Sequence, residues 1–437
     1  MMARRFRGGT HPDDRKAPTA GRPVQPLELP AEVVLPLAQH IGAPCEAAVE
    51  KGDTVHKGDL VGKPKGFVSV PVHASIGGTV TKVEPRPHPL GGMVPSVAIE
   101  RGESDEWASW CDKPQDPADM SPEDIRKRLL GMGLVGLGGA TFPTHVKLSP
   151  PDDKPIDTLV INGVECEPYL TSDYRLMLEH TDAVVDGIEL IRKVLGVERV
   201  IVGIEANKPD AIETMRNKVE TRPGWSVDEL PVMYPQGGEK QLIKATLGRE
   251  VPSGKLPMDA GVVVHNVGTC FAAAEAVLRN RPLIERVVTV TGDACENPGN
   301  FLVRLGTPLS NLVEAAGVTQ ELRRVILGGP MMGLAQSRYD VPVIKGTSGV
   351  LLLTGDAQRA YRDCIRCGRC LDGCPAGLNP SLLSVQLEAR RYPDAAETNM
   401  FDCIECGVCT YVCPSKRPIV HWVKWGKGEV NKRRKKA

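Results

Sequence analysis

Apolar and polar residues alternate in short runs near the start of the chain. From Val24 to Pro89 such runs lie between glycines and prolines, as in residues 79–83, Thr-Val-Thr-Lys-Val. Alternation with a period of two predicts strands with one buried face, and the Gly and Pro residues predict tight turns between them. This region is therefore expected to be β structure.

From Ser121 onward the pattern changes to alternating helices and strands. Ser121 can cap a helix, Pro122 suits its first position, and the acidic residues that follow favour its first turn, which predicts a helix through Leu130. Short β-branched runs at residues 157–162 and 199–204 predict strands, and residues 181–195 between them carry apolar side chains at helical spacing. Strand, helix and strand in this order predict a parallel sheet.

Two stretches of the β region, residues 55–62 and 71–80, resemble the halves of a lipoyl-type barrel-sandwich hybrid. In carrier domains of that type, the hairpin between the halves presents a modified lysine. Here the hairpin tip is expected near Phe67, after Lys63 and Lys65. A structural docking module is favoured over a swinging-arm carrier.

Charge and hydropathy narrow the class of protein. The 54 basic and 54 acidic residues cancel, so no overall charge favours nucleic acid or anionic lipid. The run from Gly261 to Leu278 is interrupted by His265, Asn266 and Glu275, and no stretch is apolar for long enough to span a bilayer. The basic N-terminus has no apolar segment, so no signal peptide is expected. Any membrane association is expected to be peripheral.

The cysteines give the strongest functional signal, because eight of the thirteen form two copies of one spacing. Each copy places three cysteines at i, i+3 and i+6 and a fourth four residues later, before a proline. This is the spacing of bacterial two-cluster ferredoxins, in which the fourth cysteine ligates the other cluster. We therefore predict one 4Fe–4S cluster (cluster 1) on Cys364, Cys367, Cys370 and Cys413, and another (cluster 2) on Cys403, Cys406, Cys409 and Cys374.

Structural zinc and disulfides are the alternatives for these cysteines. Zinc sites close with four ligands and need neither the third Cys-x-x-Cys step nor the proline, so zinc is disfavoured. The other cysteines are scattered and odd in number, which fits buried free thiols: Cys45, Cys111, Cys166, Cys270 and Cys295. Arg366 and Arg369 in the first motif, against Glu405 in the second, predict more positive surroundings for cluster 1.

Three glycine-rich or acidic segments of the α/β region could line a nucleotide pocket. Residues 134–144 are rich in glycine, which lets backbone N–H groups approach a phosphate. Residues 162–168 follow a predicted strand, the usual position of ligand-contacting loops in an open α/β sheet. Residues 237–240 open a predicted helix, whose free N–H groups can meet an anion. For each of the three segments the alternative is an ordinary turn without a ligand. For Glu165 and Glu167 the alternative is a pair of solvated loop residues.

Together with residues 265–269, these segments resemble, in the same order, the FMN- and NADH-binding motifs of the flavoprotein subunit of respiratory complex I. Residues 6–12, Phe-Arg-Gly-Gly-Thr-His-Pro, residues 327–333, Leu-Gly-Gly-Pro-Met-Met-Gly, and the double cysteine motif extend the resemblance. From Phe6 to about Pro418, the chain resembles the RnfC family, whose members are subunits of the Rnf complex, the ion-translocating ferredoxin:NAD oxidoreductase of bacteria. Residues 286–317 are similar to the small β-grasp domain of these families.

The resemblance implies FMN and NAD(H) as ligands beside the two 4Fe–4S clusters. It implies that FMN is held by Gly136, Gly138, Gly139, Lys147, Asn162, Asn266 and Thr269, with Gly237 in the same pocket. Phe142, Glu167 and Glu239 are implied where the nicotinamide nucleotide docks. Lys147 supplies the positive charge that a flavin phosphate needs, and Asn side chains can both donate to and accept from a flavin edge.

The implied function is electron transfer in a membrane-bound, ion-translocating complex. NADH gives up an electron pair as a hydride and a 4Fe–4S cluster takes one electron at a time, so a flavin must stand between them. The implied partners are a ferredoxin-like subunit, integral membrane subunits and NAD(H), but no nucleic acid, with the chain on the cytoplasmic face of the bacterial inner membrane. The alternatives are a flavin and iron–sulfur cobalamin reductase of a bacterial microcompartment and a non-catalytic electron wire or scaffold.

The expected fold is multidomain α/β and α+β. It consists of an N-terminal arm (1–23), a lipoyl-like barrel-sandwich hybrid (24–110), a Rossmann-like flavin and NADH domain (121–280), a ligand-binding β-grasp domain (281–345) and a two-cluster ferredoxin-like domain (350–420). Residues 421–437 contain Trp422, Trp425 and a basic cluster. They are expected to form a basic tail that is either solvated or adds to membrane attachment.

Overall fold

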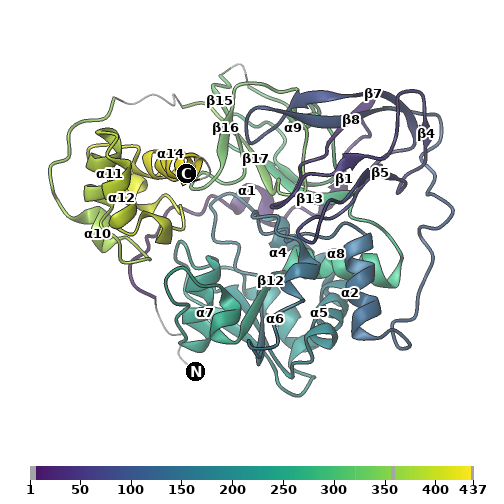
Figure 1. Ribbon diagram of the computed structural model, residues 1–437, viewed down its shortest axis with the longest axis horizontal. Helices are drawn as coiled ribbons and strands as arrows, with labels where there is room; N and C mark the ends of the chain where they lie inside the picture. Colours follow the sequence, from purple (N-terminus) through teal and green to yellow (C-terminus); the bar gives the residue numbers. More distant parts are fainter. Residues whose placement is uncertain (1–5, 320, 356–359, 435–437) are drawn as a thin grey trace.

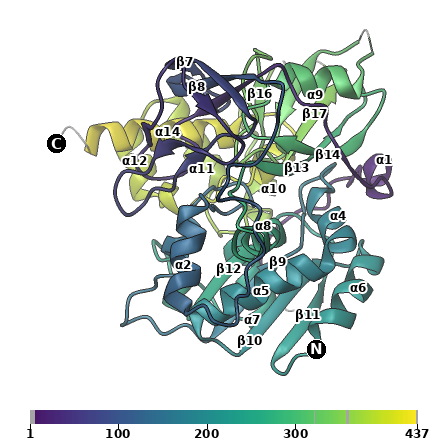
Figure 2. The ribbon, with the colours of Figure 1, turned by 90° about the vertical axis from the view of Figure 1, so that its right-hand side faces the viewer.

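The computed structural model describes residues 6–319, 321–355 and 360–434. The α/β domain, the β domains and the cysteine-rich helical domain occupy different parts of the molecule, and the N-terminal arm runs between them (Figure 1). Figure 2, turned by 90°, shows the β domains stacked above the α/β domain. Within these described ranges, no helix has both the length and the apolar character needed to cross a bilayer.

The barrel module consists of two small antiparallel sheets, in the orders β2-β8-β7-β4 and β3-β5-β6. The hairpin tip carries Phe67, whose carbonyl oxygen lies 2.8 Å from His145 Nε2 of the α/β domain, with the two rings packed edge to face. The tip therefore docks onto the neighbouring domain, in keeping with a structural module. The strands are β2 (Glu32–Pro36), β3 (Glu46–Ala47), β4 (Thr54–Val55), β5 (Leu60–Lys63), β6 (Val72–His73), β7 (Gly78–Pro87) and β8 (Met93–Arg101).

The α/β domain is built on a four-stranded parallel sheet in the order β11-β10-β9-β12. Leu159 and Ile161 of β9 face the core beneath α5 and α8, whereas Val160 faces α7 on the other side. The predicted helix from Pro122, the two strands and the helix over 181–195 are confirmed. The elements are α2 (Pro122–Gly131), α3 (Thr144–Lys147), β9 (Thr158–Asn162), α4 (Ser172–Glu179), α5 (Thr181–Leu195), β10 (Arg199–Glu205), α6 (Pro209–Val219), β11 (Trp225–Leu230), α7 (Glu239–Leu247), η1 (Pro257–Ala260), β12 (Val262–Asn266) and α8 (Val267–Leu278).

A six-stranded mixed sheet follows, in the order β1-β14-β13-β17-β15-β16. Its edges differ from the predicted boundaries of 281–345. β1 (Val24–Pro26) joins from the arm and pairs in parallel with β14, and β17 (Gly349–Leu353) lies between β13 and β15. A central strand cannot be left out without breaking two ladders, so residues 349–353 belong to this sheet and not to the cysteine-rich domain. The other elements are β13 (Glu285–Thr291), β14 (Gly299–Arg304), α9 (Leu309–Ala316), β15 (Arg324–Leu327) and β16 (Leu334–Gln336).

The cysteine-rich domain ends in a long helix where a separate basic tail is predicted. α14 (Ile419–Arg434) packs against α11 and α12 through Val423, Gly426 and Val430. A Cβ on Gly426 would overlap the Leu387 side chain, so this glycine permits a close helix approach. Residues 421–434 therefore belong to the domain, and residues 435–437 lie outside the described residues. The other elements are α10 (Arg369–Asp372), α11 (Pro380–Glu388), α12 (Tyr392–Glu397), η2 (Met400–Asp402) and α13 (Val408–Tyr411).

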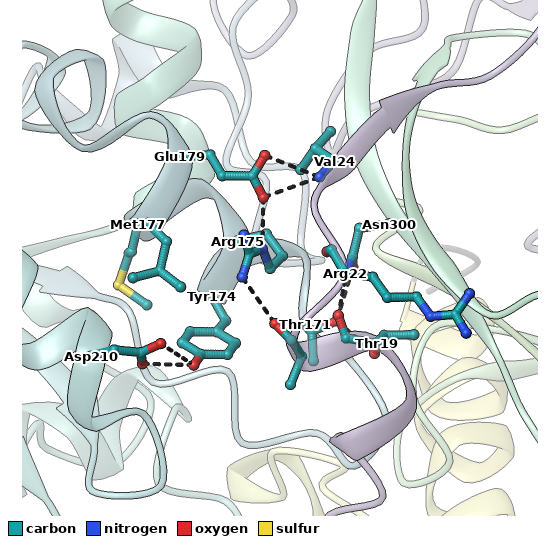
Figure 3. A network of polar contacts seen from close by, with 12 residues as sticks. Thr19, Arg22, Val24, Thr171, Tyr174, Arg175, Met177, Glu179, Asp210 and Asn300 are labelled. Atoms are coloured by element: carbon teal, nitrogen blue, oxygen red, sulfur yellow. Dashed lines mark hydrogen bonds and ion pairs between the residues drawn. The ribbon is translucent and has the colours of Figure 1, made fainter.

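The N-terminal arm ties the α/β domain to the mixed sheet, as Figure 3 shows. After α1 (Ala17–Ala20), the carbonyl oxygen of Ala20 accepts a 3.0 Å hydrogen bond from Arg175 of α4. Asn300 of β14 donates to the Thr19 carbonyl oxygen (3.0 Å) and accepts from Thr171 Oγ1 (2.9 Å). The arm thereby fixes the start of α4, which directly follows the loop of residues 162–171.

The contact between α5 and α8 depends on Gly187, where a Cβ would overlap the carbonyl oxygen of Cys270. We expect Gly187→Ala to destabilise the α/β domain by about 1–3 kcal/mol, because the two helices must separate. Thermal unfolding followed by circular dichroism measures this loss. The control is Gly131→Ala at the exposed end of α2, where the new Cβ meets nothing within 4 Å beyond the neighbouring backbone of its own helix. The account of this contact is wrong if both variants unfold at the same temperature.

Candidate functional site

The residues implied for flavin binding come together at the carboxyl ends of β9 and β12. Asn162 Nδ2 donates to the Gly237 carbonyl oxygen at 2.8 Å, and Asn266 Nδ2 donates to Asp173 at 2.6 Å. The Leu137 amide donates to Thr269 Oγ1 at 2.9 Å, which holds the glycine-rich loop against the start of α8. This edge is where an open parallel sheet presents its ligand-contacting loops.

The glycine-rich loop is closed at its base and open at its tip. The Gly136 amide donates to the Phe142 carbonyl oxygen at 2.9 Å, so residues 136–142 form a turn. Gly139, at the tip, has φ +106°, a conformation that side chains rarely adopt, and no atom lies within 4 Å of its Cβ position. The backbone there can approach a flat or anionic ligand. Gly138 is exposed and packs against Asn266, and Phe142 is half-buried.

Lys147 and Glu239 pair with each other at this edge. Lys147 Nζ donates to Glu239 Oε1 at 2.7 Å and to the Val264 carbonyl oxygen at 2.8 Å. The lysine therefore lies at the start of α7, beside the end of β12. Both side chains remain partly exposed, at 28% and 39%, so an incoming phosphate can compete for the ammonium group.

Buried polar atoms without a hydrogen-bond partner lie around this edge. His265 precedes Asn266, and burial together with nearby Lys147 holds the pKa of His265 well below its usual range, so its ring is neutral. Unpartnered buried polar atoms cost free energy unless a ligand or water satisfies them. The atoms are Thr144 Oγ1, Gln236 Nε2, Gln241 Oε1 and His265 Nε2. Their positions beside Lys147, Asn162 and Asn266 fit a polar, anionic cofactor such as FMN.

Glu167 points toward a different neighbour from the one implied. Its carboxylate accepts hydrogen bonds from the backbone amides of Met331 (3.1 Å) and Met332 (2.9 Å), so it holds the loop of residues 328–333. Burial raises the pKa of Glu167 to about 7. Lys16 of the arm fixes the same segment by donating to the carbonyl oxygens of Glu165, Glu167 and Leu170.

The eight motif cysteines line two cavities. One is lined by Cys364, Cys367, Cys370 and Cys413. The other is lined by Cys374, Cys403, Cys406 and Cys409. Each cavity thus takes three cysteines from one motif and the fourth from the other, the grouping that the spacing predicts.

The cysteines surround a volume rather than a point. In the part of the chain that the structure describes, no three His, Cys, Asp or Glu side chains are arranged to hold a single metal ion. A zinc ion needs four ligands at about 2.0–2.3 Å from one centre, whereas a cubane needs a cavity with thiolates at its corners. Ile404 and Val423 line the second cavity and supply apolar walls. The donor set therefore fits two 4Fe–4S clusters.

The second cavity lies against the α/β domain. Tyr234, 1% exposed, donates from its hydroxyl to the carbonyl oxygen of Cys406 at 2.8 Å. A buried patch, which we call the seam, joins the two domains here. The seam consists of Tyr234, Cys406 and Val408, with Cys166, Met331, Ile404 and Val412 packed against them.

The arm and the loop of residues 328–333 complete the seam. Gly9 donates to the Gly373 carbonyl oxygen, and Thr10 pairs with Tyr234. Gly8, at φ +75°, packs on the Cys374 backbone, and Gly407 packs on the Met331 carbonyl oxygen. The glycines permit these close approaches because a Cβ at either position would lie within 3 Å of backbone atoms.

Several of these residues have no signature in the sequence. Tyr234 precedes Gly237 and Gly238 before α7 but matches no motif, and Lys16 acts through carbonyl oxygens far along the chain. Lys427 also changes the expected charge balance around cluster 2. Its Nζ donates to the Cys403 carbonyl oxygen (2.6 Å) and to Glu405 (2.8 Å). Lys427 of α14 therefore neutralises the charge of Glu405. The expected difference in charge between the two cluster loops then rests on Arg366 and Arg369 of the first loop alone.

Family models match the chain in four segments. They are an RnfC barrel-sandwich hybrid domain (residues 4–104), a Nuo51 FMN-binding domain (130–275), an SLBB domain (287–335) and a 4Fe–4S dicluster domain (357–414). The predicted fold class is thereby confirmed, and the two cofactor-binding models support the expected FMN and iron–sulfur clusters.

Curated relatives are similar over nearly the whole chain, and each is the subunit lettered C of its complex. The relative from a proton-translocating ferredoxin:NAD(+) oxidoreductase complex of Clostridium ljungdahlii is 48% identical, with 98% of this chain and 94% of the relative covered. The relative from a Na(+)-translocating complex of Acetobacterium woodii is 46% identical, covering 99% and 98%. The relative from an ion-translocating oxidoreductase complex of Rhodobacter capsulatus is 42% identical, covering 98% and 83%.

A crystal structure of an NAD+-reducing NiFe hydrogenase shares the fold. The TM-score is 0.50 at 20% sequence identity, with 71% of this chain and 63% of the hydrogenase chain covered.

The crossed cysteine arrangement generates a test. Cys413→Ser is expected to damage cluster 1, and Cys374→Ser cluster 2, because each residue lies with the three cysteines of the other motif. Electron paramagnetic resonance of the dithionite-reduced proteins distinguishes the two signals, with Cys364→Ser and Cys403→Ser as references for clusters 1 and 2. Loss of the same signal in Cys413→Ser and Cys403→Ser would overturn the arrangement.

Proposed function

Because the chain belongs to the RnfC family, whose members are subunits of ion-translocating ferredoxin:NAD(+) oxidoreductase complexes, we propose that it exchanges electron pairs with NAD(H) and single electrons with the rest of such a complex. FMN at the edge of the parallel sheet and the two 4Fe–4S clusters would link these exchanges. The observation that carries the proposal is the seam, which joins the flavin-type domain to the cavity of cluster 2.

The residues proposed to hold FMN each have a chemical role. Lys147 would bind the phosphate, since its partly exposed ammonium group lies beside Glu239, the first residue of α7. Gly138 and Gly139 would bring backbone amides to the ligand, and Gly136, whose amide donates to the Phe142 carbonyl oxygen, would hold the shape of their loop. Asn162, Gly237, Asn266 and Thr269 would line the pocket and orient the ring through hydrogen bonds, as their present contacts at the ends of β9 and β12 suggest.

FMN would supply the ability to take up an electron pair and release electrons singly. The protein's own contribution is to position the partners and exclude water. Phe142 is proposed to stack on the nicotinamide ring, and Glu239, next to Lys147, to accept hydrogen bonds from the nucleotide. Glu167 is proposed to support the same site indirectly. Its carboxylate fixes the loop of residues 328–333 against the seam.

The seam supports an order for the two clusters. Cluster 2 would lie next to the flavin, because Cys406 contacts Tyr234 and Cys374 contacts the arm. Cluster 1 would lie beyond cluster 2, because Ile404 and Cys406 of the seam line the cluster 2 cavity, whereas no residue lining the cluster 1 cavity belongs to the seam. Electrons would then move between FMN, cluster 2, cluster 1 and an external carrier, in either direction.

We further propose the setting of this protein. It would sit peripherally on the cytoplasmic face of the bacterial inner membrane and contact integral membrane subunits and a ferredoxin-like subunit, with no role for nucleic acid. The names of the relatives, which refer to ion-translocating complexes, favour this setting over a cobalamin reductase of a microcompartment. The FMN content of the purified protein distinguishes the proposed electron-transfer subunit from a flavin-free scaffold.

The flavin site is tested by Lys147→Gln. Loss of the cation is expected to weaken FMN binding by about tenfold or more, since hydrogen bonds to charged groups contribute about 1.5–3 kcal/mol. FMN content and NADH-dependent bleaching should fall, while the dithionite-reduced cluster signals stay unchanged. The control is Lys244→Gln, also on the α/β domain, which removes a pair with the exposed Glu250 and a 3.5 Å hydrogen bond to the Gly248 carbonyl oxygen at the far end of α7. Full FMN retention in Lys147→Gln would remove this lysine from the site.

The cluster order predicts an asymmetry between two variants. In Cys413→Ser, NADH should still reduce cluster 2. In Cys374→Ser, NADH should no longer reduce cluster 1 at the wild-type rate, although dithionite reduces it directly. Rapid-mixing absorbance at the cluster bands, calibrated against the spectrum of each variant, measures both reactions. Wild-type reduction of cluster 1 by NADH in Cys374→Ser would contradict the order.

A further inference from the structure

The surroundings of the two clusters differ in exposure. Cys374 and Cys406 of cluster 2 are each 7% exposed, and the seam covers this side of the domain. At cluster 1, Cys367 is exposed, and Ile365, which lines the same cavity, is 67% exposed. The cluster 1 cavity therefore opens toward solvent at the Cys364–Cys370 loop.

Exposed cations surround this opening without carboxylate partners. Among the described residues, Arg362, Arg366, Arg369 and Lys416 are exposed and form no ion pair. Two exposed carboxylates, Asp363 and Asp372, lie on the same segment, so the local charge stays positive. The buried Arg417 is already paired with Glu388.

An apolar strip adjoins these cations. Leu382 and Val385 on α11 are 42% and 49% exposed, and Ser381 and Ser384 of the same helix line the cluster 1 cavity. An apolar centre with a charged rim is the usual anatomy of a protein-binding surface. We call the surface made by Arg362, Ile365, Arg366, Arg369, Leu382, Val385 and Lys416 the cluster 1 face.

We infer that the cluster 1 face is the docking surface for an acidic iron–sulfur protein, which exchanges one electron with cluster 1. The inference rests on the proposed function. One electron leaves the reduced cluster of the partner, which is oxidised by one, and reduces cluster 1 by one, or the reverse, with no bond made or broken. Unpaired arginines around an exposed cluster edge attract a negative surface and orient it over that edge.

The test is a charge reversal, Arg362→Glu with Arg369→Glu, in the holoprotein. These positions are chosen because Arg366 and Lys416 have positive φ, so changes there would also alter the backbone. The matched control is Lys51→Glu with Lys63→Glu, two exposed lysines of the barrel module. The probe is an acidic two-cluster ferredoxin, and the readout is its dissociation constant by titration at low and high salt.

The reversal is expected to raise the dissociation constant at low salt by about tenfold or more, and the difference should shrink at high salt as charges are screened. The control should bind as the wild type does. Unchanged ferredoxin binding in the reversal variant would overturn the inference. So would a loss confined to binding of anionic vesicles of phosphatidylglycerol and phosphatidylcholine, since the face would then serve a lipid surface.

NADH-driven reduction of cluster 2 is measured in the same samples. It should be equal in wild type and reversal variant, because the flavin site and the seam are untouched. If NADH does not reduce the wild-type protein, the proposed function is contradicted. The ferredoxin titration still tests the cluster 1 face in that case, because binding is measured without NADH.

Discussion

The hydrogen bond from Tyr234 to the Cys406 carbonyl oxygen joins parts of the chain that are 172 residues apart, and the proposed electron path depends on it. Single electrons cross protein only over short gaps, so a flavin-type domain and a cluster domain that merely shared a chain would not exchange them. The seam brings the domains into contact through buried apolar side chains and one satisfied hydroxyl. Burying that hydroxyl without a partner would cost about 1–3 kcal/mol, so the contact also selects one orientation of the domains.

The arm makes this contact specific. Lys16 is buried, with its ammonium group satisfied by carbonyl oxygens of the loop of residues 165–170. Burial lowers the pKa of Lys16, and a buried ammonium group is tolerated only where acceptors surround it. Gly8 and Gly9 then carry the chain between Cys374 and Tyr234, where a Cβ would not fit. The arm, the loop of residues 165–170 and the backbone at Cys374 therefore fix one another's positions.

Regular periodicity and fixed spacing made part of this molecule predictable. The strand over 157–162 and the helix over 181–195 follow from local patterns. The spacing also predicts the crossed grouping of cysteines, and the same grouping lines the two cavities. The contacts of Glu167 and Lys427 could not be predicted, because each depends on a partner brought close only by tertiary packing.

Where prediction failed, packing outweighed local composition. Gly426 and Gly428 weaken a helix by about 1 kcal/mol each relative to alanine, which favours a tail over residues 421–437. Helix α14 forms nevertheless, because burial of Val423 and Val430 against α11 and α12 outweighs that cost. Likewise, β17 lies beyond the predicted edge of its domain, since its strand partners are set by the sheet and not by neighbouring sequence.

The central claim is that the flavin-type domain communicates with cluster 1 only through cluster 2. Freeze-quench electron paramagnetic resonance of the wild-type protein after mixing with NADH tests this most directly, with the two signals assigned from the cysteine variants. The account predicts that electrons reach cluster 2 before cluster 1 at the earliest times. Arrival at cluster 1 first would contradict it.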